Sequence, residues 1–237
     1  MQWKGGLKNM LKISFHRTIM TDIIKDIYSD VSIGPVLGFK GGTALYFFYN
    51  LPRFSIDLDF DLLNESKKDI VFRQVTKIVK KYGELRQKRD KYFNLFWLLS
   101  YQKGLSQLKI EISKRSSENK YEVKNFFGIP GLVMNKEDMF ANKLTALLNR
   151  KSLANRDIYD IWFMLHEHWD LNDKLLEFRT KIKTKLYLKK CLKLLENNPP
   201  TNILEGIGDL VDNKTKDWIK KNLIKDTIFL LKANFEI

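Results

Sequence analysis

The sequence predicts an α+β protein in which a mixed α/β half is followed by a helical half. Up to about residue 130, short apolar or alternating runs are bounded by Gly, Pro and Asn, which is typical of strands and turns. After that point the apolar residues recur every three or four positions, which is typical of amphipathic helices. We therefore expect a first domain over residues 1–130 and a helical domain over residues 131–237.

The first half begins with a helix from His16 to about Ser29, where isoleucines recur at helical spacing. The run "PVLGF" predicts a strand, and "TALYFFYN" predicts a short helix that ends at Asn50 and Pro52. The next run, "FSIDLDFDLL", alternates apolar and acidic residues with a period of two. This alternation predicts a strand with one buried face.

A helix is expected next, from about Ser66 to Tyr82, and then the β-rich runs "YFNLFWLLSY" and "QLKIEIS". The segment "QKGLSQ" between these runs is compatible with a hairpin turn. One more strand, "YEVKNFF", precedes a break at Gly128, Pro130 and Gly131.

The second half is predicted to be helical throughout. Helices are expected for "NKEDMFANKLTALLNR" and "NRDIYDIWFMLHEHW", with Asn135 and Asn155 as their N-caps. From about Asn172 the pattern continues as helix, with a turn between Asn197 and Pro200.

Composition limits the classes of function. The formal net charge of +14 favours a polyanionic partner, with nucleic acid first and an anionic membrane surface second, although lysines can also simply solvate a surface. A single cysteine, Cys191, excludes an internal disulfide and a cysteine-rich zinc site. Neither a signal peptide nor a run of eighteen apolar residues is present, so we expect a cytoplasmic protein without a membrane partner.

Three acids lie close together in the alternating strand. Residues two apart on a strand share a face, so Asp57, Asp59 and Asp61 should lie on one side. Carboxylates are preferred ligands of hard divalent cations, and a pair of such cations can promote phosphoryl transfer. An edge strand with a solvated acidic face would give the same pattern.

Two glycines precede that strand by one short helix. Gly41 and Gly42 end a strand and open a helix, where backbone N–H groups can bind phosphate, and Thr43 adds a hydroxyl donor. An ordinary Gly-rich turn would look the same in isolation. Because the acids follow so closely, one small unit could hold both a triphosphate and a metal ion.

The combined pattern "GGTAL…LPRFSIDLDF" resembles the AbiEii/AbiGii toxin branch of the DNA polymerase beta-like nucleotidyltransferases. The "R-x-S-x-D-x-D" form, with Arg53 and Ser55 before the two acids, is the more specific part of this resemblance. It implies a mixed-sheet nucleotidyltransferase core, Mg²⁺ held by Asp57 and Asp59, and an NTP substrate. It also makes Arg53 and Ser55 candidate nucleotide-binding residues beside the glycines.

The same superfamily uses a third carboxylate from a neighbouring strand. In "QLKIEIS", Glu111 is the one acid on the polar face, so it is the candidate third metal ligand. A surface pair between Glu111 and Lys109 is the alternative. Asp61 is a weaker candidate, because it would lie about 7 Å further along its strand than Asp59.

A second group of polar residues follows the sheet. The toxin branch carries a K-L-x-A-L-x-x-R motif and an R-D-x-x-D motif, which match Lys143 to Arg150 and Arg156 to Asp160. By this resemblance Lys143 and Asp157 are catalytic: the lysine would bind nucleotide phosphates, and Asp157 would orient it or take part in proton transfer. Asp160 would be structural, either as a cap or as the partner of a neighbouring base such as Arg156. A solvated lysine and an acid at a helix start are the plainer interpretation.

The resemblance, which covers about residues 36 to 165, implies transfer of NMP from an NTP to an acceptor with release of pyrophosphate. The expected acceptor is a tRNA 3′ end, and a cognate antitoxin is the expected partner in a type IV toxin–antitoxin or phage-abortive system. A non-catalytic nucleotide- or RNA-binding regulator and a transferase that modifies a protein hydroxyl remain as alternatives.

Overall fold

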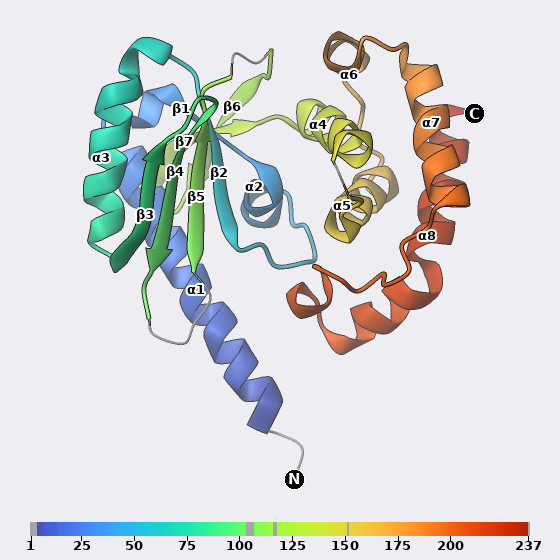
Figure 1. The fold of residues 1–237 in the computed structure, drawn as a ribbon, viewed down its shortest axis with the longest axis horizontal. Helices are drawn as coiled ribbons and strands as arrows, with labels where there is room; N and C mark the ends of the chain where they lie inside the picture. The colour runs from blue at the N-terminus through green and yellow to red at the C-terminus, as the bar shows by residue number, and fades with distance from the viewer. Residues whose placement is uncertain (1–3, 103–106, 116–117, 151, 237) are drawn as a thin grey trace. The chain divides into compact units, whose positions relative to one another are not determined.

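The computed structural model describes residues 4–102, 107–115, 118–150 and 152–236, and in these the chain divides into two units. The first unit contains residues 1–48, 55–117 and 121–134. The second contains residues 49–54, 118–120 and 135–237. The expected α+β class is confirmed, because one unit is built on a sheet and the other on helices (Figure 1). The two domains expected with a boundary at 130 remain a prediction.

The first unit is built around a mixed sheet, which in the described residues has seven strands in the order β3-β4-β5-β2-β1-β7-β6. Strand β2 pairs antiparallel with β1 and parallel with β5, so it lies at the centre of the sheet. The strands are β1 (Leu37–Lys40), β2 (Asp57–Leu62), β3 (Glu84–Asp90), β4 (Asn94–Ser100), β5 (Leu108–Ser113), β6 (Tyr121–Phe126) and β7 (Ile129–Met134).

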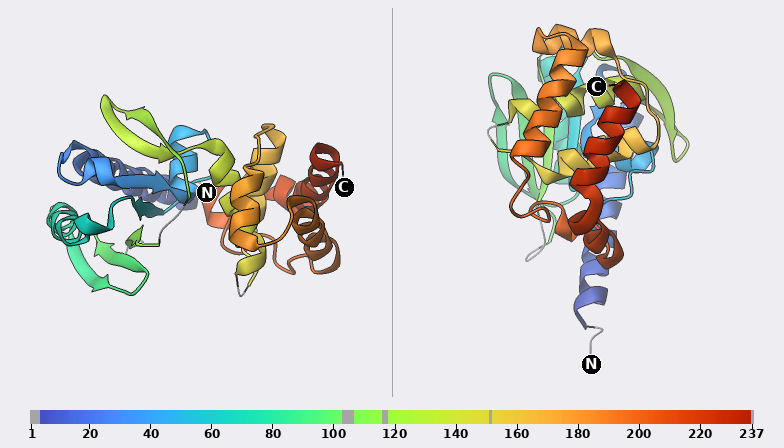
Figure 2. Two further views of the ribbon diagram at one scale, coloured as in Figure 1. Left: turned by 90° about the horizontal axis from the view of Figure 1, so that it is seen from above. Right: turned by 90° about the vertical axis from the view of Figure 1, so that its right-hand side faces the viewer.

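Three helices cover one face of this sheet: α1 (Lys4–Ser29), α2 (Gly41–Phe48) and α3 (Lys68–Lys80). Tyr28 of α1 contacts the ring of Phe60, and Phe48 of α2 contacts Phe39, which pairs with Phe60. Figure 2 gives two further views of these helices beside the strands.

Helix α3 packs on the β3–β4 end of the same face. Its Thr76 accepts a hydrogen bond of 2.9 Å from the indole of Trp97, which is fully buried. Because β2 alternates, its acids therefore lie on the opposite face of the sheet.

Two of these strands were not expected from the sequence. Strand β3 lies at the sheet edge with nearly all its residues exposed, so it shows no apolar alternation. Strand β7 occupies the segment that was expected to be a break at Pro130 and Gly131. The predicted strands β1, β2, β4, β5 and β6 are confirmed, and β4 pairs antiparallel with β5 as a hairpin would. Residues 103–106 of the expected turn lie outside the described residues.

The second unit is helical, as expected. It consists of α4 (Lys136–Asn149), α5 (Asn155–His166), α6 (Asp173–Thr180), α7 (Thr184–Asn197) and α8 (Asn213–Phe235), with α7 and α8 side by side. Asn135 caps α4 through a 3.1 Å hydrogen bond from the backbone N–H of Asp138, which confirms that predicted cap. Asn155 does not cap α5, because Ala154 occupies the N-cap position.

Two short segments from the first half of the sequence belong to the second unit. In residues 49–54, the backbone N–H of Phe54 donates a 2.8 Å hydrogen bond to the carbonyl of Leu210. In residues 118–120, the N–H of Lys120 donates to the buried carboxylate of Asp138 at 2.6 Å. The segment that joins α2 to β2 is thus held by the helical unit.

No helix among the described residues combines the length and the apolar character needed to cross a membrane.

Candidate functional site

A row of paired residues crosses the open face of the sheet in the first unit. Asp59 of β2 lies opposite Glu111 of β5 on one side and opposite Lys40 of β1 on the other. Asp57 lies two residues before Asp59 on the same face, opposite Lys109. The structure therefore brings Asp57, Asp59 and Glu111 together on two adjacent strands, as the sequence predicted.

The ammonium of Lys109 lies among these three acids. Its Nζ is 3.3 Å from Oδ2 of Asp57 and 3.8 Å from Oε2 of Glu111. Burial alone would lower the pKa of Lys109, but the charges of Asp59, Asp57 and Glu111 outweigh it and raise that pKa above its ordinary value. Lys109 therefore acts as an internal counter-ion for the acidic group.

Asp59 lies in an environment that disfavours its charged form. Burial raises its pKa above the ordinary value, Lys109 opposes this, and the neighbouring charge of Asp57 adds to it. Among the described residues, however, no three or more His, Cys, Asp or Glu side chains converge closely enough to hold a metal ion. The donor set has the chemistry of a cation site, but here the nearby positive charge is Lys109.

Asp61 has a different environment from the other two acids of β2. It is buried, its Oδ1 lies 2.5 Å from the ammonium of Lys40, and its Oδ2 accepts a hydrogen bond from the hydroxyl of Tyr121. A carboxylate that is paired in this way contributes to folding. This agrees with its lower rank as a third site acid.

The two glycines begin α2 directly beside Asp59. Gly41 has φ of +78°, and a Cβ at this position would lie 2.8 Å from Oδ2 of Asp59. Gly42 is in the first turn of the helix, where N–H groups have no intrahelical acceptor. Thr43 is buried, and its hydroxyl donates to the backbone carbonyl of Asp57. The hydroxyl of Thr43 thus connects the start of α2 to the start of β2.

The second group of predicted residues lies in the helical unit, where it forms a buried charge network. Nζ of Lys143 lies 2.9 Å from Oδ1 of Asp157 and 2.6 Å from Oδ2 of Asp160. Both aspartates are fully buried. Burial alone would lower the pKa of Lys143, but the two carboxylates raise it, so this lysine stays protonated.

Asp160 pairs with Arg53, so the expectation of a partner such as Arg156 was wrong. The guanidinium of Arg53 donates to both oxygens of Asp160, through Nε and Nη2 at 2.6 Å each. Arg53 is 3% exposed, so its guanidinium is committed to this pair. Ser55, two residues later, is also buried. The nucleotide-binding roles predicted for Arg53 and Ser55 remain predictions.

Asp157 is held from two sides. Nε of Arg150 lies 2.8 Å from its Oδ2, an ion pair without the alignment of a hydrogen bond, so Oδ2 accepts none. The contact between Asp157 and Lys143 agrees with the predicted orienting role of the aspartate. The contact of Lys143 with nucleotide phosphates remains a prediction.

Two residues that contact the three acids were not predicted from the sequence to do so. Lys109 was treated only as a partner of Glu111, although it is closer to Asp57. Asn94 of β4 donates from Nδ2 to Oε1 of Glu111 and was not singled out. The polar face of β5 carried a signal for Lys109, whereas Asn94 becomes visible only from the pairing of β4 with β5.

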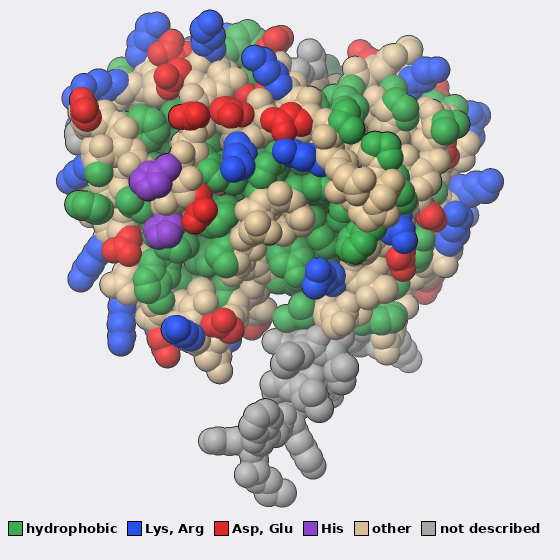
Figure 3. All heavy atoms as spheres, turned by 180° about the vertical axis from the view of Figure 1, so that it is seen from behind, with side chains coloured by type: hydrophobic (Ala, Val, Ile, Leu, Met, Phe, Trp, Pro, Cys, Tyr) green, Lys and Arg blue, Asp and Glu red, His purple; other side chains and the backbone are tan. Residues whose placement is uncertain are grey.

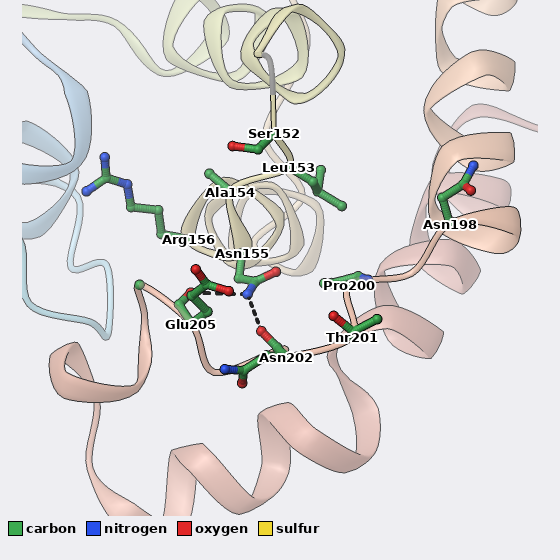
Figure 4. A pocket seen from close by; sticks show the side chains of 11 residues that line it. Ser152, Leu153, Ala154, Asn155, Arg156, Asn198, Pro200, Thr201, Asn202 and Glu205 are labelled. Carbon is green, nitrogen blue, oxygen red and sulfur yellow. Dashed lines mark hydrogen bonds between the residues drawn. The ribbon is translucent and has the colours of Figure 1, made fainter.

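A pocket of about 540 Å³ opens in the helical unit near the start of α5. It is lined by residues 152–156, 198, 200–202, 205 and 206. Nδ2 of Asn155 donates to the carbonyls of Asn202 and Glu205, at 2.7 and 3.1 Å (Figure 4). Asn155 therefore connects the start of α5 to the loop after α7, in place of the cap that the sequence suggested.

Comparison with known proteins extends these observations. A family model described as "Nucleotidyl transferase AbiEii toxin, Type IV TA system" matches residues 22–220, which include every candidate site residue. An uncharacterized protein of Aquifex aeolicus (strain VF5) is 29% identical over 227 residues, which are 90% of this chain and 98% of the relative.

Among solved structures, JHP933 from Helicobacter pylori shares the fold. It superimposes with a TM-score of 0.66 at 23% identity, over 94% of this chain and 92% of JHP933. The Gly-Gly helix, the paired acids of β2 and β5 and the Lys143–Asp157 pair all lie inside the region matched by the family model. The chain belongs to the AbiEii family of nucleotidyltransferase toxins.

Proposed function

We propose that this protein transfers NMP from an NTP to the 3′ end of a tRNA, releases pyrophosphate, and acts as the toxin of a type IV toxin–antitoxin or phage-abortive system. The observation that carries this proposal is the row in which Glu111 lies beside Asp59, with Asp57 two residues away and Gly41 in contact with Asp59. Carboxylates and an open helix start thus lie side by side, which suits a triphosphate with its counter-ions.

Carboxylate oxygens are ligands that divalent cations prefer, so the chemistry of Asp57, Asp59 and Glu111 suits such ions, and we propose Mg²⁺. Asp57 and Asp59 would hold them, with Glu111 assisting. A bound cation would stabilise the charged form of Asp59, whose pKa is raised by burial first and then by the charges of Asp57 and Glu111. Bound Mg²⁺ would neutralise charge on the triphosphate and on the attacking oxygen. Lys109 must then move away from Asp57, because two positive charges cannot share the same carboxylate oxygen at low cost.

The chain's own groups would bind and orient the nucleotide. The first-turn N–H groups of α2, beginning at Gly41 and Gly42, would donate to phosphate oxygens. An acceptor hydroxyl would attack the α-phosphorus, the bond from this phosphorus to the bridging oxygen of the β-phosphate would break, and pyrophosphate would leave. The hydroxyl proton would pass to solvent or to a neighbouring carboxylate. By family resemblance, Lys143 would add positive charge near the phosphates, with Asp157 orienting it.

The acceptor is proposed to be tRNA because the net charge of +14 favours a polyanion and because the family resemblance favours a tRNA 3′ end. A cytoplasmic location would supply both NTP and tRNA. A cognate antitoxin is the proposed protein partner.

The test uses the purified full chain with each α-labelled NTP and Mg²⁺, offered total tRNA in one reaction and a protein extract in another. We expect label in RNA, pyrophosphate in equal amount, and loss of both in Asp57→Asn. Asp69→Asn, an exposed acid on α3, is the matched control and should retain activity. Label in protein would identify a protein-modifying transferase, and no transfer with intact NTP binding would indicate a non-catalytic regulator.

A further inference from the structure

Net charge alone does not locate a binding surface for RNA. In the face drawn in Figure 3, Lys and Arg side chains are scattered among Asp and Glu and do not gather in one patch. The open face of the sheet is more informative, because residue pairing fixes which side chains lie next to the candidate site.

The row through Asp59 continues past Glu111 to the edge of the sheet. Glu111 pairs with Phe96 of β4, and Phe96 pairs with Arg89 of β3. Paired residues share a face, so Phe96 and Arg89 lie on the same side as the acids. Phe96 is two strand spacings from Asp59, which is about 10 Å.

This part of the open face is apolar and basic at once. Phe96 and Leu98 are only half-buried, whereas Leu95 and Trp97 on the other face of β4 are fully buried, with Trp97 against Phe72 of α3. The ammonium of Lys91 lies over the Phe96 ring, 4.2 Å from its centroid. A charged group and an aromatic ring are therefore already stacked beside the third acid.

The turn between β3 and β4 adds exposed aromatic surface. Tyr92 is 86% exposed and Phe93 is 50% exposed. The guanidinium of Arg115, just after β5, lies 4.3 Å from the Phe93 ring. Large aromatic side chains that remain exposed next to cations are typical of surfaces that stack nucleic-acid bases.

The lysines and arginines of the edge strand β3 could also be present for a different reason, because charges on an edge strand prevent edge-to-edge aggregation. That explanation covers the charges of β3 but not the half-exposed Phe96 or the exposed Tyr92, which add apolar surface. Exposed aromatic rings next to cations are therefore better explained by binding to a strand of RNA than by solvation of the surface.

The two sides of the group formed by Asp57, Asp59 and Glu111 carry different features. The Gly41–Gly42 helix start, which would bind the triphosphate, follows β1 on one side of β2. Glu111, Phe96 and Arg89 lie on the other side. An acceptor that attacks the α-phosphate in line would approach from the side opposite to the leaving pyrophosphate.

We propose that the β3–β4 part of the open sheet face, defined by Arg89, Lys91, Phe96 and Leu98 with Tyr92 and Phe93 at its end, binds the single-stranded 3′ end of the RNA acceptor. Phe96 stacks on a base near the terminal hydroxyl, and Arg89 and Lys91 contact phosphates. This inference rests on the proposed function, because it names the surface that presents the acceptor to Asp57 and Asp59.

The test measures binding of a fluorescent single-stranded RNA with a free 3′-hydroxyl to the full chain by anisotropy, without NTP. Phe96→Leu keeps the apolar side chain and removes the ring, so we expect binding to weaken about tenfold, as for one lost base stack. Arg89→Gln/Lys91→Gln should make the dependence of log affinity on log salt shallower by about 1.4, the value for two phosphate contacts to a single strand.

The matched control is Lys77→Gln/Lys80→Gln, which removes the same charge from exposed positions on α3, on the covered side of the sheet. It should bind RNA as the wild type does, and melting temperatures should confirm that all variants fold. NTP affinity, measured separately, should be unchanged in Phe96→Leu.

Wild-type affinity for RNA in both Phe96→Leu and Arg89→Gln/Lys91→Gln would overturn the inference while leaving the proposed transfer to RNA intact. A loss of NTP affinity in Phe96→Leu, with RNA binding retained, would assign the surface to the nucleotide base instead. If the wild type binds no RNA and labels protein, the proposed RNA-binding surface and the proposed RNA acceptor are both wrong. The proposal of nucleotidyl transfer would still be supported.

Discussion

The α-carbon of Gly41 lies so close to the carboxylate of Asp59 that a Cβ on Gly41 would be 2.8 Å from Oδ2. This contact connects the phosphate-binding candidate with the metal-binding candidate, because any side chain at Gly41 must displace the acid. We expect Gly41→Ala to abolish transfer and to cost about 1–2 kcal/mol from the positive φ. Gly128→Ala is the control, because Gly128 has φ of +87° but a Cβ added there would meet nothing within 4 Å. Equal loss of activity in the two variants would contradict this account.

Asp59 and Asp61 should respond in opposite ways to loss of charge. Asp59→Asn should raise the melting temperature in metal-free buffer, because it removes a charge that burial disfavours and that Asp57 repels, by about 2–4 °C for each kcal/mol gained. Asp61→Asn should lower the melting temperature, because weaker contacts with Lys40 and Tyr121 reduce the free energy of unfolding by about 1.5–3 kcal/mol. Thermal unfolding with chelator measures both, and a fall in both variants would assign Asp59 to folding.

Lys109 should compete with metal ions. Removing its ammonium in Lys109→Met leaves Asp57, Asp59 and Glu111 without their internal counter-ion, so stability should fall in chelator. Mg²⁺ should then restore more stability than it does in the wild type, because binding to the folded state adds RT ln(1 + [L]/Kd). The measurement is melting temperature against Mg²⁺ concentration, and parallel curves for the two proteins would argue against a metal at these acids.

Asp160 should be important for the stability of the helical unit. Its two oxygens are shared by Arg53 and Lys143, so Asp160→Asn should cost about 3–5 kcal/mol, as expected when one member of a buried ion pair is lost. Urea unfolding measures this, with Asp170→Asn at an exposed position as the control.

The same group predicts a pH dependence. Burial would raise the pKa of Asp160, but Arg53 and Lys143 outweigh it and hold the pKa below the ordinary value of about 3.9. Its contribution to stability is therefore complete above that value and is lost as the pH falls toward the folded-state pKa. Below about pH 4, the free energy of unfolding should fall more steeply with pH in the wild type than in Asp160→Asn. Identical slopes for the two proteins would contradict this role of the Asp160 carboxylate.

Lys143→Ala and Arg150→Ala are a matched pair of variants, because each removes one cation from Asp157. If Lys143 contacts phosphate as proposed, Lys143→Ala should lose about 1.5–3 kcal/mol of a charge-assisted interaction. Charge builds up during transfer, so we expect kcat to fall with KM little changed, and a smaller effect in Arg150→Ala. Steady-state kinetics with melting temperatures would test this, and unchanged kinetics in Lys143→Ala would leave the lysine a purely structural role.

The parts of the fold that could be predicted are those whose burial leaves a local pattern. Strand β2 was recognised because its apolar residues Leu58 and Phe60 are fully buried, whereas Asp57 and Asp59 on the other face are only partly buried. Strand β3 could not be recognised in this way, because an exposed edge strand has no buried face to impose alternation.

Strand β7 was missed because of Pro130, which is normally excluded from central strands. The structure explains why it is tolerated. Strand β7 pairs with β1 only through Leu132 and Val133, so Pro130 lies beyond the paired region on that side.

The site was predictable to a similar extent. The resemblance implied a third carboxylate on a neighbouring strand, Glu111 was the one acid on the polar face of its strand, and the structure pairs it with Asp59. The bidentate contact of Arg53 with Asp160 spans 107 residues, and nothing in either local pattern indicates it, because the packing of α5 determines which base reaches the acid.

The assignment of residues 49–54 to the helical unit has a consequence for synthesis on the ribosome. Once residue 134 has emerged, the seven described strands of the sheet are available, but Asp160 and Leu210, which bind Arg53 and Phe54, have not yet been made. Asp160 and then Leu210 must be translated before that segment can be fixed. A prematurely terminated chain would therefore present the Gly-Gly helix and the acids of β2 with an unanchored connection between them. Translation past Leu210 would therefore be a condition for an ordered connection between α2 and β2.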